Sequence, residues 1–248
     1  MQKMRPLSRA ITIMEEPRRR DDGTMTLFSA CQGGQYEMVK SILDEEPTFL
    51  ANSGRGGKAL TIACSFGHLE VVRLLLSRGA NPNATDNEAG SCLFNACSEK
   101  HYAIVELLLE NGESPNASRQ YDGASALHVS SYQGEVEMVK LLLFYGADIN
   151  AVQYSGKTAL FAACQEGHAA VVRILLKYGA NAGMRLRSTG ETALLVATQN
   201  NHVEVVEALL VRYADVDSAR YDGVTPLLLA SYYGYSKLVD ILVSHGAH

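Results

Sequence analysis

One segment of the chain reads Tyr154-Ser-Gly-Lys-Thr-Ala-Leu-Phe-Ala-Ala-Cys-Gln-Glu-Gly-His-Ala-Ala-Val-Val-Arg-Ile-Leu-Leu-Lys-Tyr-Gly-Ala-Asn181, and the rest of the chain repeats this pattern. Its copies surround seven leucines spaced 33 or 34 residues apart: Leu27, Leu60, Leu93, Leu127, Leu160, Leu194 and Leu227. A fixed period of this length is typical of a stack of similar supersecondary units, which bury their core against their neighbours. We therefore predict an all-α repeat solenoid rather than a globule with a central cleft.

Each copy predicts a polar turn followed by two helices. A glycine-containing segment such as Tyr121-Asp-Gly123 favours a loop or a short hairpin. A hydroxyl residue then caps a first helix of roughly ten residues, which ends at a glycine in the left-handed conformation. In two copies that glycine is replaced, by Lys100 and by Asn201. A left-handed residue other than glycine costs about 1–2 kcal/mol. We therefore expect the array to open first near these two copies.

These motifs resemble those of the ankyrin-repeat family. The resemblance is carried by Tyr221-Asp-Gly-Val-Thr-Pro-Leu-Leu-Leu-Ala-Ser-Tyr-Tyr-Gly234 and by Leu142-Leu-Phe-Tyr-Gly-Ala-Asp-Ile-Asn150. It implies an ankyrin-repeat stack, with two helices and a β-hairpin or loop in each repeat. It covers residues 21–248, and the expected repeats are approximately 21–53, 54–86, 87–119, 120–153, 154–187, 188–220 and 221–248.

The charge is distributed unevenly along the chain. Residues 1–20 carry six basic and two acidic residues, whereas residues 21–248 carry 16 basic and 25 acidic ones, a net charge of −9. An acidic array argues against nucleic acid as the main partner. Since no apolar run approaches the roughly 20 residues that span a bilayer, we expect no membrane insertion. The basic leader is expected to be disordered, with a mitochondrial transit peptide as the alternative.

The cysteines and histidines are expected to be structural, so we predict neither a metal nor a cofactor. Four cysteines, Cys31, Cys64, Cys97 and Cys164, occupy one equivalent position, and Cys92 stands where the family motif has proline. Equivalent points on packed helices lie about 8–10 Å apart, too far for a disulfide or a shared zinc ion. Free cysteines favour a reducing compartment, so we expect a cytoplasmic protein, possible also in the nucleus. The resemblance implies that the histidines of the Gly-His motif bond to backbone between repeats: His68, His101, His168 and His202.

The resemblance also implies a binding surface, formed by the loop tips and the exposed face of the first helices, which line a concave groove in this family. Twelve residues match these positions: Arg55, Phe66, Glu99, Tyr121, Tyr132, Tyr154, Lys157, Glu166, Glu191, Tyr221, Tyr232 and Tyr233. Tyrosine is enriched at interfaces, although each of these rings could instead pack against its neighbouring repeat. The interleaved acidic residues favour a partner protein or peptide of basic or mixed charge.

We therefore predict a monomeric, non-catalytic interaction scaffold. The alternatives are a substrate-recognition adaptor of a ubiquitin-ligase complex, an ankyrin fragment of a larger multidomain protein, and an enzyme. The last is disfavoured because the sequence contains no catalytic motif that we recognise. The resemblance further implies three sites of possible asparagine hydroxylation in the turns between repeats: Asn83, Asn116 and Asn150. The competing interpretation is that these asparagines only satisfy turn backbone.

Overall fold

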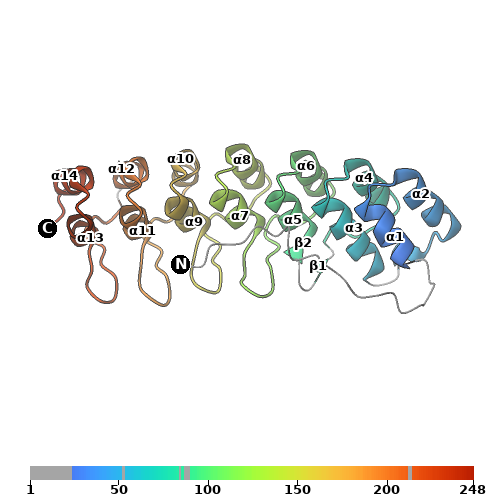
Figure 1. The fold of residues 1–248 in the computed structure, drawn as a ribbon, viewed down its shortest axis with the longest axis horizontal. Helices are drawn as coiled ribbons and strands as arrows, with labels where there is room; N and C mark the ends of the chain where they lie inside the picture. The colour runs from blue at the N-terminus through green and yellow to red at the C-terminus, as the bar shows by residue number, and fades with distance from the viewer. Residues whose placement is uncertain (1–23, 52–53, 84, 87–89, 212–213) are drawn as a thin grey trace.

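The computed structural model describes residues 24–51, 54–83, 85–86, 90–211 and 214–248. Its helices form two rows, with the loops projecting from the side of the first row (Figure 1). The first row consists of α1 (Thr24–Gln32), α3 (Arg55–Ser65), α5 (Cys92–Ser98), α7 (Ala126–Tyr132), α9 (Ala159–Glu166), α11 (Ala193–Gln199) and α13 (Pro226–Tyr233). The second row consists of α2 (Tyr36–Glu45), α4 (Leu69–Ser77), α6 (Tyr102–Glu110), α8 (Val136–Phe144), α10 (Ala169–Lys177), α12 (Val203–Val211) and α14 (Ser236–Ser244). The predicted all-α solenoid is confirmed.

Most first-row helices are shorter than the ten residues expected: α5, α7 and α11 have seven, and α9 and α13 have eight. Each begins directly after its predicted cap. The hydroxyl groups of Ser91, Thr158, Thr192 and Thr225 accept a backbone N–H of their own helix. A short 3-10 helix covers Phe49–Ala51. Among the described residues, strands occur only at β1 (Thr85–Asp86) and β2 (Gly90–Ser91), an antiparallel pair.

The core lies between the two rows and between successive helix pairs. The repeating leucines from Leu27 to Leu194 are at most 1% exposed. All five cysteines are free and buried, which confirms their predicted role as small packing residues. Burial raises the pKa of the Cys97 thiol to about 12, so this side chain stays a neutral thiol at physiological pH.

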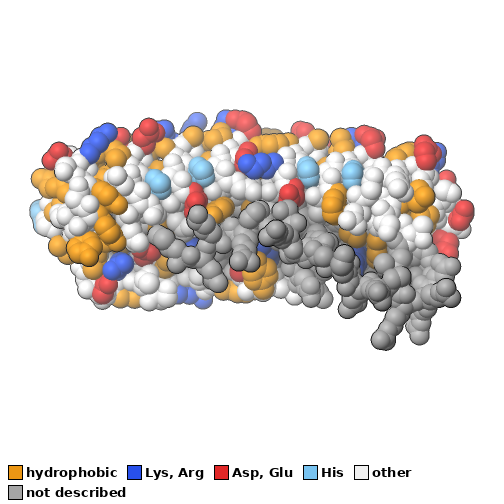
Figure 2. Space-filling model, viewed as in Figure 1, with side chains coloured by type: hydrophobic (Ala, Val, Ile, Leu, Met, Phe, Trp, Pro, Cys, Tyr) orange, Lys and Arg blue, Asp and Glu red, His pale blue; other side chains and the backbone are white. Residues whose placement is uncertain are grey.

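Successive helix pairs are joined by side chains that bond to the last-turn carbonyl of the preceding first-row helix. Four of these bonds use histidine Nε2: His68 to Gln32 (2.8 Å), His101 to Ser65 (3.4 Å), His168 to Tyr132 (2.9 Å) and His202 to Gln165 (3.0 Å). At the remaining two junctions the donors are Gln133 Nε2, to Ser98 (2.7 Å), and the Tyr235 hydroxyl, to Gln199 (3.5 Å). The predicted histidine ladder is confirmed, and other donors complete it. Figure 2 shows histidine side chains in a row along the face that it presents.

The glycines at the ends of four first-row helices, Gly34, Gly67, Gly134 and Gly167, are coupled to this ladder. A Cβ atom on Gly67 would lie 2.5 Å from the His101 ring, and one on Gly134 would lie 2.6 Å from the His168 ring. The two predicted left-handed exceptions are confirmed, with φ angles of 63° at Lys100 and 58° at Asn201. The facing residue of the next helix pair is then not histidine. Beside Lys100 it is Glu135, which pairs with Lys100, and beside Asn201 it is Tyr235. A side chain is thus tolerated at the helix end only where no imidazole needs the space.

We expect Gly134→Ala to lower the free energy of unfolding by about 3 kcal/mol, because it combines left-handed strain with a collision against His168. Gly112→Ala is the matched control. Gly112 has a similar φ angle, 82° against 77° for Gly134, but a Cβ there would meet nothing within 4 Å. The control should lose only the backbone contribution of about 1 kcal/mol. Urea unfolding of both variants measures the difference, and equal losses would show that the ring contributes nothing.

Candidate functional site

The ends of the first-row helices present a row of half-buried and exposed side chains. We call this set the first-helix face: Ser65, Phe66, Ser98, Glu99, Tyr132, Gln133, Gln165, Glu166, Gln199, Asn200, Tyr232 and Tyr233. Each first-row helix from α3 to α13 provides two adjacent residues at its end, and in α3, α5, α7 and α11 the second of them directly follows the helix. Phe66, Tyr232 and Tyr233 are 40%, 84% and 47% exposed. Hydrophobic side chains gather at the end of the array formed by α13 and α14 (Figure 2). The other six of the twelve predicted contact residues lie elsewhere, in or beside the loops.

The predicted loop tyrosines have a structural role as well as an exposed surface. The Tyr154 hydroxyl donates to the Gln120 carbonyl at 2.8 Å, and its ring lies 3.0 Å from where a Cβ on Gly123 would stand. The Tyr221 ring covers Gly190 in the same way, at 2.6 Å. Both rings therefore pack on the preceding loop, although 61% of Tyr154 and 68% of Tyr221 stay exposed. The packing interpretation holds for these two, whereas Tyr232 and Tyr233 contact mainly each other and Tyr235.

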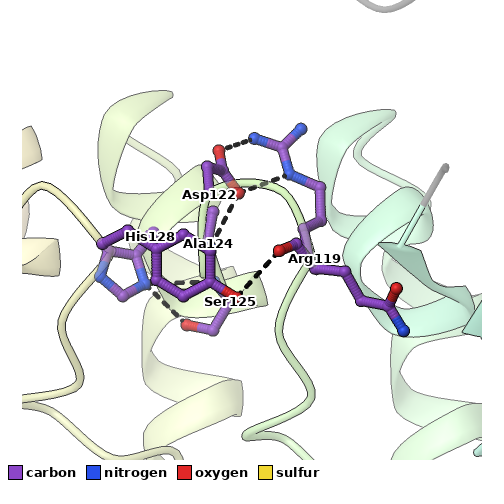
Figure 3. A network of polar contacts seen from close by, with 7 residues as sticks. Arg119, Asp122, Ala124, Ser125 and His128 are labelled. Carbon is purple, nitrogen blue, oxygen red and sulfur yellow. Dashed lines mark hydrogen bonds and ion pairs between the residues drawn. The ribbon is translucent and has the colours of Figure 1, made fainter. Parts of the chain in front are cut away.

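Arg119 is a residue that sequence reasoning missed. Its side chain is only 7% exposed, and its guanidinium lies 4.3 Å from the centre of the Phe94 ring and 4.4 Å from that of Tyr121. Its Nε donates to Asp122 at 3.2 Å, and its other contact with Asp122 is an ion pair. Asp122 also accepts the Ala124 N–H, and Ser125 bonds to His128 directly behind this turn (Figure 3). This arrangement fixes the predicted tip residues Tyr121 and Asp122 in place.

Several predicted charges come together near α9. The Lys157 ammonium donates to Gln165 at 3.0 Å, and the Gln165 amide donates to Glu166 at 2.8 Å. Burial raises the pKa of Glu191, against the opposing charges of Arg220 and Lys157. Burial also raises the pKa of Tyr132, and the Glu166 charge adds to that shift. The surface here therefore carries both signs of charge.

Arg55 is not at a loop tip, contrary to the prediction. It begins α3, and its guanidinium lies 5.3 Å from the centre of the Phe49 ring. The helix starts early because Lys58 stands where other copies have a capping Ser or Thr, so Gly54 takes the N-cap position instead. The predictions for the leader, residues 1–20, lie outside the described residues.

The three turn asparagines join adjacent repeats. Asn83 donates to the Gly112 carbonyl at 3.1 Å and accepts the Ser114 N–H at 2.9 Å. Asn116 makes the same two bonds with Gly146 and Asp148, and Asn150 accepts the Asn181 N–H at 2.8 Å. These contacts support the structural interpretation. Hydroxylation of these residues stays a prediction. Mass spectrometry of the protein from its native source, showing no added oxygen, would rule it out.

Two pockets formed by described residues lie away from the first-helix face. One, of about 450 Å³, is lined by α10 and α12 with Arg173, Lys177 and Val211, and the other, of about 150 Å³, lies beside Thr192 and Ser218. The part of the chain that the structure describes contains no group of three or more His, Cys, Asp or Glu placed to hold a metal ion. None of its helices is long and apolar enough to cross a membrane.

Comparison with known proteins agrees with this architecture. A family model described as ankyrin repeats, in three copies, matches residues 9–86, 93–185, 145–220 and 178–248. One similar solved structure is the ankyrin repeat domain of Bcl-3, described as a unique member of the IkappaB protein family. It is 30% identical with a TM-score of 0.69, over 76% of this chain and 86% of that chain. Comparison with curated protein sequences found no match. The chain belongs to the ankyrin-repeat family.

Proposed function

We propose that this protein is a non-catalytic interaction module that binds a partner protein or an extended peptide along the first-helix face and the adjoining loop tips. Ankyrin repeats generally mediate protein–protein interaction. The observation that carries the proposal is the exposure of Tyr232, 84%, next to Tyr233 and in line with Glu166 and Tyr132. Large aromatic side chains offer contact area and a polar group at little entropic cost.

The chemistry of the buried groups supports a non-catalytic role. His128 and Ser125 are hydrogen-bonded, but the Ser125 hydroxyl is buried and caps α7. Burial lowers the pKa of His128, whose other ring nitrogen bonds to the Lys157 carbonyl at 3.2 Å. Both side chains of this pair are therefore engaged in holding the loop.

The charge of the face favours a partner of basic or mixed charge. Glu99 and Glu166 lie on the first-helix face itself, while Lys157 and Glu191 flank it. The array of residues 21–248 has a net charge of −9, so a basic segment would be attracted from a distance.

The test compares two triple variants in capture from native lysate. Tyr132/Tyr232/Tyr233→Ala removes aromatic area from the first-helix face, and Phe144/Tyr178/Val211→Ala removes exposed area from the second row, where these residues are 82%, 56% and 69% exposed. We expect a partner that the wild type and the second variant retain and the first variant loses. Thermal melts of all three proteins establish that each is folded. A partner lost only by the second variant would place the interface on the opposite row and contradict the proposal.

A further inference from the structure

Two carboxylates of the first-helix face have no cationic partner among the described residues. Glu99 directly follows α5 and Glu166 ends α9, at equivalent positions of their repeats, and no ion pair reaches either of them within the described ranges. Nearby acids differ in this respect. Glu135 pairs with Lys100, Asp122 pairs with Arg119, and Asp222 pairs with Arg220. Ion pairs therefore neutralise these three acids but neither Glu99 nor Glu166 within the described ranges. Glu166 reaches a cation, Lys157, only through the Gln165 amide.

The distance between these carboxylates fits a particular spacing in an extended chain. Helix α5 packs against α7, and α7 packs against α9, so the two residues are two helix pairs apart. At about 8–10 Å for each step the separation is about 16–20 Å. Six residues span about 20 Å in a β-strand and about 19 Å in a polyproline II helix. Side chains return to the same side of the chain at every second residue in a β-strand and at every third residue in a polyproline II helix. Two peptide side chains that point to the same side in both conformations and lie this far apart must therefore be six residues apart in the sequence.

We propose that the first-helix face selects an extended peptide segment that carries two basic residues six positions apart. This inference rests on the proposed function and specifies its partner. The residue that meets Glu166 is expected to be arginine, because Tyr132 ends α7, the helix that packs against α9 where Glu166 is the last residue, and its half-buried ring can contact a guanidinium. Helix α13 is two further helix pairs along the array, so an apolar residue six positions beyond the second base would meet Tyr232 and Tyr233.

The experiment measures fluorescence anisotropy of labelled 15-residue synthetic peptides with the full chain. One peptide carries two arginines six positions apart and a leucine a further six along, in a background of serine and alanine. Its isomer has the same composition with the arginines three apart. We expect the first peptide to bind about fivefold more tightly, the upper range for one added exposed ion pair. Glu99→Gln and Glu166→Gln should each weaken the binding of this peptide about fivefold and remove the preference for it over its isomer.

The matched control is Glu106→Gln, which makes the same charge change on the exposed side of α6. It should leave both affinities unchanged. Equal binding of the two isomers, or an equal loss with Glu106→Gln, would show general charge attraction and overturn the inference. So would absence of saturable binding by either peptide. A lysate partner lost with Tyr132/Tyr232/Tyr233→Ala but kept by Glu99/Glu166→Gln would also overturn it, while the proposed function would stand.

Discussion

Replacing Arg119 with alanine is expected to lower the free energy of unfolding by about 2–4 kcal/mol, the largest loss we expect from any single loop residue. The guanidinium is almost fully buried between Phe94 and Tyr121, and it pairs with Asp122. Its removal deletes two desolvated cation–π contacts and leaves a half-buried carboxylate without its cation. Arg119→Lys should recover only part of the loss, because an ammonium group cannot lie flat between two rings or bond in bidentate fashion.

Arg220→Ala is the control for this prediction. Arg220 makes the same type of contact with Asp222, at 3.2 Å and 2.8 Å, but in an exposed loop and without rings on both sides. Urea unfolding followed by circular dichroism should therefore show a much smaller change for Arg220→Ala. If the two alanine variants lost equal stability, the pairing with aspartate would account for the effect and the burial between Phe94 and Tyr121 would not.

The helices were predictable because their signals are local and repeated. Capping residues such as Thr158 and helix-ending glycines such as Gly167 occur at fixed offsets from each leucine, so errors in one copy are corrected by the others. The left-handed angles of Lys100 and Asn201 followed from the same alignment. Helix length was overestimated. In α3, α5, α7 and α11 the residue before the left-handed one already lies in a turn outside the helix, whereas α9 and α13 extend up to their glycine.

The loops were less predictable because their contacts depend on neighbours in space. Arg119 is charged and lies in a loop, so its sequence context gives no sign of burial. Its partners Phe94 and Tyr121 belong to different repeats. Arg55 was misplaced for a local reason, the missing hydroxyl cap at Lys58. Glu135 and Tyr235 stand where other repeats have histidine, and they face the two non-glycine residues Lys100 and Asn201. This correlation was visible in the sequence, by comparing the end of each first helix with the following repeat.

Unpaired polar atoms concentrate where the third and fourth helix pairs meet. Five buried side-chain atoms there have no hydrogen-bond partner within the described residues: Asn95 Nδ2, Glu113 Oε2, Ser130 Oγ, Ser131 Oγ and Gln133 Oε1. An unsatisfied buried polar atom costs about 1–3 kcal/mol. Together with the left-handed Lys100, these atoms lead us to expect that the array opens near Lys100 before it opens near Asn201. That order stays a prediction, to be tested by amide hydrogen exchange.

Glu113 makes the stability of this region dependent on pH. It is 2% exposed, at a position where other repeats have alanine, as at Ala80 and Ala147. Its Oε1 accepts the Leu93 N–H at 2.8 Å, but burial outweighs that bond and raises the pKa of the carboxyl from 4.5 to about 7. The groups facing it are the Ser91 hydroxyl and the Cys64 and Cys97 thiols, none of which supplies a positive charge.

The folded chain therefore holds the Glu113 proton more tightly than the unfolded chain does. Its contribution to the free energy of unfolding is full below pH 4.5 and falls by roughly 3 kcal/mol as the pH rises to about 7. Glu113→Gln keeps an acceptor for Leu93 but cannot ionise, so we expect it to match the wild type near pH 4.5 and to exceed it by about 2–3 kcal/mol at pH 8. Urea unfolding at both pH values measures this divergence. Glu110→Gln, an exposed change in the same repeat, should run parallel to the wild type. Parallel curves for Glu113→Gln as well would mean that the carboxyl ionises in the folded chain as readily as in the unfolded one.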